Sequence, residues 1–350
     1  MADFLLCRRC LPVMATPPIG ESTLAKLKQG SLLWFYGFKE ACCVHRVAIF
    51  CYRSKSLLIR TSQCFLFNGF IFLGSVYILK AFLVPMLEWI LPSQCPHILY
   101  EEVWRYGVIL TIYSTTRKLL IQLIYLVWFY PLYVSSIILS NIWYNDIAKH
   151  GFIAMGKHKP STARMAAEKE ASIVQIPGSD KSAGLEGIMI GIGEQVYSVL
   201  LLSFFFLEVF ATGFIPYAGK ALNFLLLSWM YAYYCFEYKW NLSGVTLDRR
   251  LDFFESNWAF FAGFGSPCVL AIFFFPPLES YAVMATLFPL FVLTATGSDA
   301  DNLVSSLRKQ WLGVGLGRVP IFCGADTVSM KVLSFLPLRS REQNQGKKAL

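Results

Sequence analysis

The side chains that most often carry enzyme chemistry are few and scattered in this sequence. Catalysis needs an acid, a base, a nucleophile or metal ligands gathered in one place. The chain has four histidines, His45, His97, His150 and His158. They share no motif, and Cys7 and Cys10 form a single Cys-x-x-Cys, whereas a structural zinc site needs four ligands. We therefore expect no enzyme activity, no metal site and no cofactor.

Two ionisable residues, Lys80 and Glu208, lie inside apolar runs. An ionised side chain at the centre of a membrane costs about 2.5 to 3.5 kcal/mol unless it is paired or hydrated. The two can pair across helices, or they can line a polar path for a solute. An anion path normally presents several cations or helix N-termini, so the sequence favours the pair. Lys80 is also close enough to the end of its run to extend its ammonium group to the membrane surface.

A third set of polar residues forms a charged island between two apolar runs. Its charged members are Glu237, Lys239, Asp248, Arg249, Arg250, Asp252 and Glu255. Aromatic side chains flank the island, as they do at membrane–water boundaries. Hydrocarbon does not tolerate this charge density, so we interpret the island as a connector at a membrane surface. We expect its charges to hold the loop against the helices rather than to bind a ligand.

The overall composition is that of a membrane protein. Hydrophobic residues make up 56% of the chain and aromatic residues 16%, which exceeds what one soluble domain can bury. Apolar runs close to the ~20 residues needed to cross a bilayer occupy residues 64–87, 119–143, 196–215, 221–236, 258–275 and 281–296. They are continuous rather than alternating, which indicates helices. The sequence predicts an all-α, multi-pass membrane protein with six hydrophobic helices.

The last four runs are joined in pairs by short turns. Residues 215–220 connect the third run to the fourth, and residues 276–280 connect the fifth to the sixth. Each pair is therefore predicted to form a tight helical hairpin. Such a hairpin can cross the bilayer or enter and return on the same side, and both arrangements remain open.

The distribution of Lys and Arg predicts the topology, because basic segments stay on the cytosolic side. The expected order is a cytosolic basic segment (1–63), a first membrane helical pair (64–143), a cytosolic linker (144–186), a second membrane half with two helical hairpins (187–296) and a cytosolic basic tail (297–350). Both termini are then cytosolic. This bias and attraction to anionic lipids account for the net charge of +9, and no nucleic-acid motif accompanies it. We expect the lipid bilayer as a partner and no nucleic acid.

An amphipathic helix is expected before the first run. Leu27, Ser31, Trp34, Phe38, Ala41 and His45 recur at helical spacing. The helix can lie on the membrane surface or pack against the membrane helices as a cytosolic element. The sequence leaves both arrangements open.

One set of motifs is specific enough to indicate a family. The set comprises Glu237, Tyr238, Lys239, Trp240, Asn257, Trp258, Gly263, Gly265 and Pro267. With these motifs the chain resembles the etoposide-induced, autophagy-associated transmembrane protein family of the eukaryotic endoplasmic reticulum, over residues 57–297. More remotely, it is similar to bacterial sulfate permeases of cysteine biosynthesis, whose fold includes hairpins that penetrate the membrane only partly.

The resemblance implies an endoplasmic reticulum membrane protein that acts in autophagy and membrane traffic without catalysis. We expect the island with its motif residues, the basic linker and the basic tail to be the contact surfaces for cytosolic protein partners. The alternative that the resemblance suggests is a transporter or channel for a small, sulfate-like anion.

The end of the chain independently indicates the same compartment. Lys347 and Lys348 occupy the fourth and third positions from the C-terminus. This arrangement is similar to the dilysine retrieval signal, which coat proteins read on cytosolic tails of endoplasmic reticulum proteins. Two lysines can also occur by chance in a basic tail.

Overall fold

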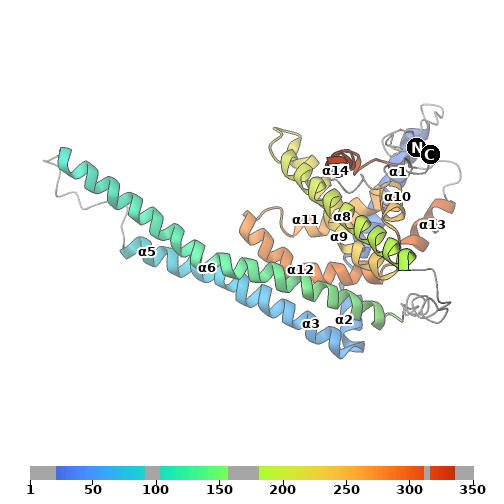
Figure 1. Ribbon diagram of the computed structural model, residues 1–350, viewed down its shortest axis with the longest axis horizontal. Helices are drawn as coiled ribbons and strands as arrows, with labels where there is room; N and C mark the ends of the chain where they lie inside the picture. Colours follow the sequence, from blue (N-terminus) through green and yellow to red (C-terminus); the bar gives the residue numbers. More distant parts are fainter. Residues whose placement is uncertain (1–20, 91–102, 157–180, 311–315, 336–350) are drawn as a thin grey trace. The chain divides into compact units, whose positions relative to one another are not determined.

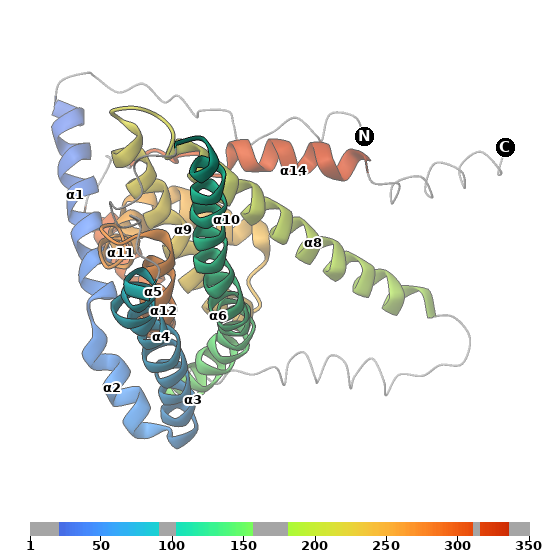
Figure 2. The same ribbon diagram turned by 90° about the vertical axis from the view of Figure 1, so that its left-hand side faces the viewer.

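The computed structural model describes residues 21–90, 103–156, 181–310 and 316–335 (Figures 1 and 2). These residues form helices and no strand, which confirms the all-α prediction. Each of the six apolar runs lies in a helix for most of its length. Lys347 and Lys348 lie outside the described residues.

Only some of these helices are long and apolar enough to cross a membrane. In the described part of the chain they are the segments Lys55–Ile90, Thr111–Ala154 and Pro277–Gly297, and the apolar segments Val196–Thr212 and Trp258–Leu270 are shorter. At 1.5 Å per residue the latter segment rises about 20 Å, less than the ~30 Å of a hydrocarbon core. The structure therefore supports a multi-pass helical protein, and the count of six crossings is not confirmed.

The chain folds into two compact units. Unit 1 contains the described residues of Met1–Val44, Met155–Val269 and Thr294–Leu350, and unit 2 those of His45–Ala154 and Leu270–Leu293. The expected tail thus belongs with the helices of unit 1.

Unit 2 is built around one long, nearly uninterrupted helix. Its segments are α3 (Lys55–Phe65), the π-helix η2 (Leu66–Leu73), α4 (Gly74–Ile78), the π-helix η3 (Leu79–Leu83) and α5 (Val84–Ile90). Ser54 begins it, because its extended backbone lets the hydroxyl accept a hydrogen bond from Leu57 N at 3.3 Å. The amphipathic α2 (Val44–Arg53) precedes it, and α6 (Val103–Ala154) and α12 (Pro277–Gly297) pack beside it.

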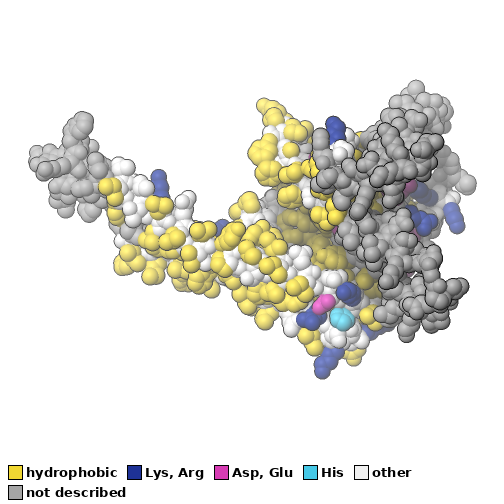
Figure 3. Space-filling view, in the orientation of Figure 1, with side chains coloured by type: hydrophobic (Ala, Val, Ile, Leu, Met, Phe, Trp, Pro, Cys, Tyr) yellow, Lys and Arg dark blue, Asp and Glu magenta, His cyan; other side chains and the backbone are white. Residues whose placement is uncertain are grey.

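The surface of unit 2 is largely apolar. Its two longest membrane-crossing segments bury only 22% and 17% of their most apolar windows. Hydrophobic side chains cover much of the visible face of α6, and charged side chains gather where α2 and α3 meet (Figure 3). An exposed apolar surface of this kind is stable when lipid covers it.

Unit 1 is a helical bundle with an aromatic core. Its helices are α1 (Glu21–Ala41), α8 (Lys181–Thr212), α9 (Gly219–Leu242), α10 (Leu247–Ser256), α11 (Trp258–Leu270), α13 (Ala300–Gln310) and α14 (Cys323–Phe335). α8 and α9 form the first predicted hairpin, whose turn places Tyr217 at a φ of 60°. Residues 271–276 join α11 to α12.

Glycines set the closest helix contacts in unit 1. A Cβ added to Gly37 would overlap the backbone of Phe260, and one added to Gly263 would overlap the backbone of Trp34. Gly265 approaches the Ser228 carbonyl of α9 equally closely. Small residues allow such approaches between helix backbones. The family glycines therefore hold α11 against both α1 and α9.

The structure shows which face of α1 is packed. Its buried side chains are Gln29, Leu33, Glu40 and Ala41. Of the expected face, Ala41 is therefore buried, whereas Leu27, Ser31 and Trp34 are exposed. α1 thus packs within unit 1 through the face that contains Gly37, where its backbone approaches that of α11, and not through its bulky residues. The exposed side chains remain free to contact lipid.

We predict that Gly263→Ala destabilises the protein by about 3 kcal/mol, because the new methyl group forces α1 and α11 apart. Gly74→Ala is the matched control, since nothing lies within 4 Å of its added Cβ. That control should change stability by less than about 1 kcal/mol. Denaturant unfolding in detergent checks both, and equal effects would contradict the packing described.

Candidate functional site

The family motif begins in the last turns of α9, where Lys239 is buried. Its exposed fraction is 8%, and its Nζ donates a hydrogen bond to the Ser298 carbonyl at 2.6 Å. The ammonium group also lies 5.9 Å from the centre of the Phe236 ring. A buried cation needs such partners to remain charged. Lys239 therefore attaches α9 to the backbone that follows α12.

Its neighbours in the motif contribute packing and a partly buried carboxylate. Trp240 contacts the rings of Tyr233 and Phe261, with ring centres 5.7 and 6.0 Å apart. Tyr238 and Glu237 are half-buried. Burial raises the pKa of the Glu237 carboxyl above its ordinary value, and the positive charge of Arg250 opposes this rise.

Asn257 and Trp258 form the junction between α10 and α11. The Asn257 side chain donates from Nδ2 to the Phe253 carbonyl at 2.8 Å, and the backbone carbonyl of Asn257 accepts from Phe260 N at 3.0 Å. The Trp258 indole donates to the Gly317 carbonyl at 3.2 Å. These bonds end one helix and begin the next. The last motif residue, Pro267, lies inside α11 and is half-buried.

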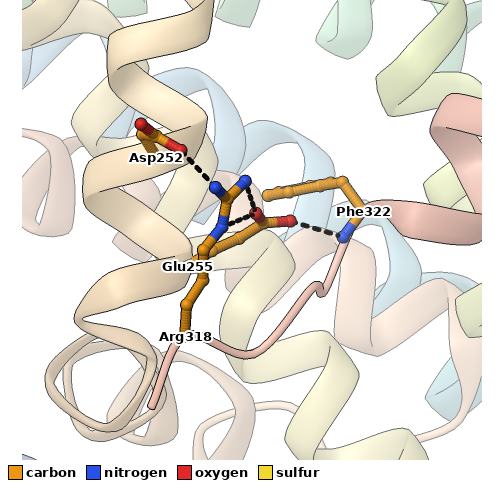
Figure 4. Close-up of polar contacts among 4 residues, drawn as sticks. All are labelled: Asp252, Glu255, Arg318 and Phe322. Carbon is orange, nitrogen blue, oxygen red and sulfur yellow. Dashed lines mark hydrogen bonds and ion pairs between the residues drawn. The ribbon is translucent and has the colours of Figure 1, made fainter. Parts of the chain in front are cut away.

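A buried carboxylate, Glu255, connects this motif region to the C-terminal part of the chain (Figure 4). Its side chain is fully buried, and Oε2 accepts from Arg318 Nε at 2.9 Å and Nη2 at 2.6 Å. Oε1 accepts from the Phe322 backbone N–H at 3.1 Å, and Arg318 Nη1 also contacts Asp252 at 2.6 Å. We call Asp252, Glu255, Arg318 and Phe322 the carboxylate clamp.

The clamp inserts an aromatic ring into the core of unit 1. Phe322 is fully buried, and its ring centre lies 4.8 Å from that of Phe205, 5.3 Å from Tyr233 and 5.7 Å from Phe254. Asp326, on α14, accepts a hydrogen bond from the Tyr197 hydroxyl of α8. Residues 323–335, which form α14, are therefore part of the folded unit.

In the sequence Glu255 stands out only as one charge of the island, and the clamp was not predicted. The burial of Glu255 could have been predicted from the helical spacing, because this residue lies on the same helical face as the buried residues Leu247, Leu251 and Phe254. A carboxylate on an apolar face needs a partner. The partner, Arg318, is distant in sequence, so spacing alone does not reveal it.

The two ionisable residues of the apolar runs have separate environments. Lys80 forms an ion pair with Glu279 of α12, both in unit 2. Glu208 is in unit 1, where a Cβ added to Gly324 of α14 would overlap its carboxylate. The structure thus does not pair Lys80 with Glu208. The physical reason is that Glu279 begins the helix that packs directly beside Lys80.

Unit 2 contains a buried polar network in its membrane-crossing helices. Asn68 is fully buried, and its Nδ2 donates to Ser140 Oγ at 2.9 Å and to the Ala285 carbonyl at 3.2 Å. Its Oδ1 accepts from Ser136 Oγ at 2.8 Å, and the Tyr144 hydroxyl donates to Ala285 O at 2.8 Å. The network joins η2, α6 and α12 through neutral groups.

Two ion pairs bracket this network. Arg60 contacts Asp146 at 3.5 Å on one side, and Lys80 contacts Glu279 on the other. No charged residue lies between Arg60 and Lys80 in the sequence. At about 1.5 Å per residue the intervening helix rises about 30 Å, which is the thickness of a hydrocarbon core. Within the described residues, no three His, Cys, Asp or Glu side chains gather as metal ligands.

Comparison with known proteins adds evidence to this geometry. A family model described as Sulfate transporter CysZ/Etoposide-induced protein 2.4 matches residues 43–295. The match includes the motif on α9 to α11, two of the three segments long and apolar enough to cross a membrane, and all but the last two residues of the third. It does not reach Arg318 or Phe322. No solved structure matches the chain.

Individual relatives extend the similarity. Protein EI24 homolog of Arabidopsis thaliana is 59% identical over 321 residues, covering 91% of this chain and 99% of that protein. Protein EI24 homolog of Dictyostelium discoideum is 26% identical, over 86% of this chain and 84% of its own length. Ectopic P granules protein 4 of Caenorhabditis elegans is 27% identical, over 47% of this chain and 46% of that protein.

We predict that Glu255→Gln destabilises unit 1 by about 3 kcal/mol, because Arg318 loses its buried counter-charge. Asp252→Asn should cost less than about 1 kcal/mol, since the Asp252 side chain is 65% exposed. Limited proteolysis within residues 316–335, combined with thermal unfolding, distinguishes them. Equal resistance of the two variants would contradict the clamp.

We also predict that Asn68→Leu destabilises unit 2 by about 2 kcal/mol, because Ser136, Ser140 and the Ala285 carbonyl lose a buried partner. Asn141→Leu is the control, since Asn141 is exposed and bonds only locally, to the Ile137 carbonyl. Unfolding in detergent micelles measures both. If the control is the more damaging change, the network is not a stabilising feature.

Proposed function

This chain belongs to the family described as Sulfate transporter CysZ/Etoposide-induced protein 2.4, and on that premise we propose that it acts in autophagy and membrane traffic. It does so as a multi-pass protein of the endoplasmic reticulum membrane with both termini in the cytosol. It works through contacts with lipids and cytosolic proteins and not through catalysis.

The family match carries this proposal. It covers residues 43–295 and is supported by 59% identity to the Arabidopsis relative over most of both chains. The resemblance of the α9 to α11 motif implies the role in autophagy and the endoplasmic reticulum. Lys347 and Lys348 would bind the retrieval coat and return the protein to this compartment.

Unit 1 supplies the surface that we assign to cytosolic partners. Asp248 and Arg249 of α10 and Lys309 of α13 are exposed. The carboxylate clamp holds α10 to the segment at Arg318 and Phe322, and Arg308 of α13 donates to the Ser256 carbonyl at the end of α10 at 2.8 Å. A rigid, charged surface suits recognition of protein partners, because little conformational entropy is lost on binding.

Transport of a small, sulfate-like anion is the second candidate. The observation that favours it is the buried network of Asn68, Ser136 and Ser140, since polar groups inside a membrane often mark a solute path. Against it, the network groups bond to one another and carry no charge. A structural role explains them more simply.

Autophagic flux in cells depleted of the protein tests the first candidate. We expect blocked flux, restored by the intact chain and restored less well by a chain with Lys347→Ala and Lys348→Ala, because that chain would leave the endoplasmic reticulum. The Lys331→Ala variant, which alters one exposed lysine of α14, is the matched control and should rescue fully.

Unchanged flux after depletion would contradict the proposal. Sulfate uptake by vesicles containing the purified protein then becomes the deciding measurement. Uptake that exceeds the rate in protein-free vesicles would establish the second candidate.

A further inference from the structure

A cleft in unit 2 has the features of a lipid site. Its volume is about 520 Å³, and it lies between the α3–η2 segment and α12. Its lining residues are Thr61, Ser62, Phe65, Leu66, Gly69, Phe70 and Thr286. The hydroxyl residues Thr61 and Ser62 line one end of the cleft, and mostly apolar side chains line the rest, with Thr286 beside Gly69.

The hydroxyl end carries a buried hydroxyl group and an exposed one. Thr61 is 6% exposed, and within the described structure its Oγ1 interacts with the Cys51 thiol but has no hydrogen-bond partner of good distance and angle. Buried polar groups normally find a partner in the protein or in a bound molecule. Ser62, one residue on, is exposed. Ser62 therefore offers a hydrogen bond to a ligand in the cleft, and Thr61 lies beside it in the lining.

Positive charge lies just beyond this end. Lys55 is seven residues before Ser62, so helical geometry places both on one face of α3, about 10 Å apart along the axis. Lys55 is exposed, as is Arg53 at the end of α2, and Lys55 is the first residue of α3. A helix N-terminus attracts anions through its free N–H groups and its dipole.

The opposite end of the cleft is suited to hydrocarbon. Phe65, Leu66 and Phe70 follow the hydroxyl residues toward the membrane interior, and Gly69 keeps the space open because it lacks a side chain. The π-helix η2 forms this wall. π-Helical segments widen a helix and occur frequently at functional sites.

We propose that this cleft binds an anionic glycerophospholipid. One acyl chain lies along Phe65 to Phe70, the ester region contacts Thr61 and Ser62, and the phosphate lies near Lys55 and the start of α3. A bilayer lipid fits better than a soluble anion, because the cleft is mostly apolar and belongs to a membrane-crossing helix. This inference deepens the lipid contacts of the proposed function and rests on the membrane position of unit 2.

A second groove in unit 2 serves as an internal reference. Its volume is about 860 Å³, and it is lined by one face of α6 with Leu278, mostly through apolar side chains such as Leu119, Leu123 and Leu126. Any acyl chain can fill such a groove. Lipid contact there should not depend on the headgroup.

Photo-crosslinking of the full chain in nanodiscs tests the proposal. The probes are phosphatidic acid and phosphatidylcholine with a diazirine on one acyl chain. We expect phosphatidic acid to label residues 61–70 at least about fivefold more than phosphatidylcholine does. One lysine beside an anionic headgroup contributes about 1 kcal/mol, which corresponds to this ratio of affinities. Labelling of the reference groove should be the same for both lipids.

Four variants make the result specific. Lys55→Ala should remove the preference for phosphatidic acid at residues 61–70, whereas Lys149→Ala, an exposed lysine of α6, should keep it. Gly69→Phe should abolish labelling there by filling the cleft, and Gly74→Phe should not, because open space surrounds Gly74. Helical circular dichroism of each variant confirms folding.

Equal labelling of residues 61–70 by both lipids would overturn the proposal. So would a loss of labelling in the folded Gly74→Phe variant equal to that in Gly69→Phe. Neither labelling result depends on the proposed role in autophagy, because autophagic flux is measured in a separate experiment in cells. A normal lipid preference with unchanged flux would retain the lipid site and reject the cellular role.

Discussion

The cost of an unpaired charge in a low-dielectric environment governs both units of this protein. In unit 2 the segment between Arg60 and Lys80 carries no charge. Both of these cations are paired, Arg60 with Asp146 and Lys80 with Glu279. The polar groups between the two ion pairs are neutral and bonded to one another through Asn68. The sequence can cross a bilayer because this stretch carries no charge and its most buried polar group, Asn68, is hydrogen-bonded.

The same constraint organises unit 1. The buried carboxylate of Glu255 needs a cation, and Arg318 supplies it. In forming this bond, the chain after α13 returns to α10 and inserts Phe322 into the aromatic core. Lys239 meets the same requirement with the Ser298 carbonyl. Charges that stand out in the sequence as a polar island are, in the fold, the attachments between α9, α10 and the C-terminal segments.

The sequence was sufficient for the features that depend on local pattern. Continuous apolar runs predicted the helices, and the turn at Pro216 predicted the hairpin of α8 and α9. Contacts between distant residues were harder to predict. Lys80 was expected to pair with Glu208, but hydropathy does not indicate which helix packs beside η3, and that helix carries Glu279.

Two further features could not be read from local pattern. Arg318 was counted only as part of a basic tail, because nothing near it in the sequence indicates a buried partner. The packed face of α1 also differed from the expected one, since Gly37 permits a backbone contact that a hydrophobicity pattern does not record. The residues that hold distant elements together are thus the ones that spacing arguments miss.

The central claim is that the ion pairs of Arg60 and Lys80 mark the two surfaces of the membrane. Cysteine accessibility in intact microsomes tests it most directly, using Ser56→Cys before Arg60 and Met86→Cys beyond Lys80 in a folded, cysteine-free background. Both positions are exposed in unit 2. The account predicts that a membrane-impermeant maleimide labels position 56 at once and position 86 only after permeabilisation. Labelling of both positions from the cytosolic side would contradict it.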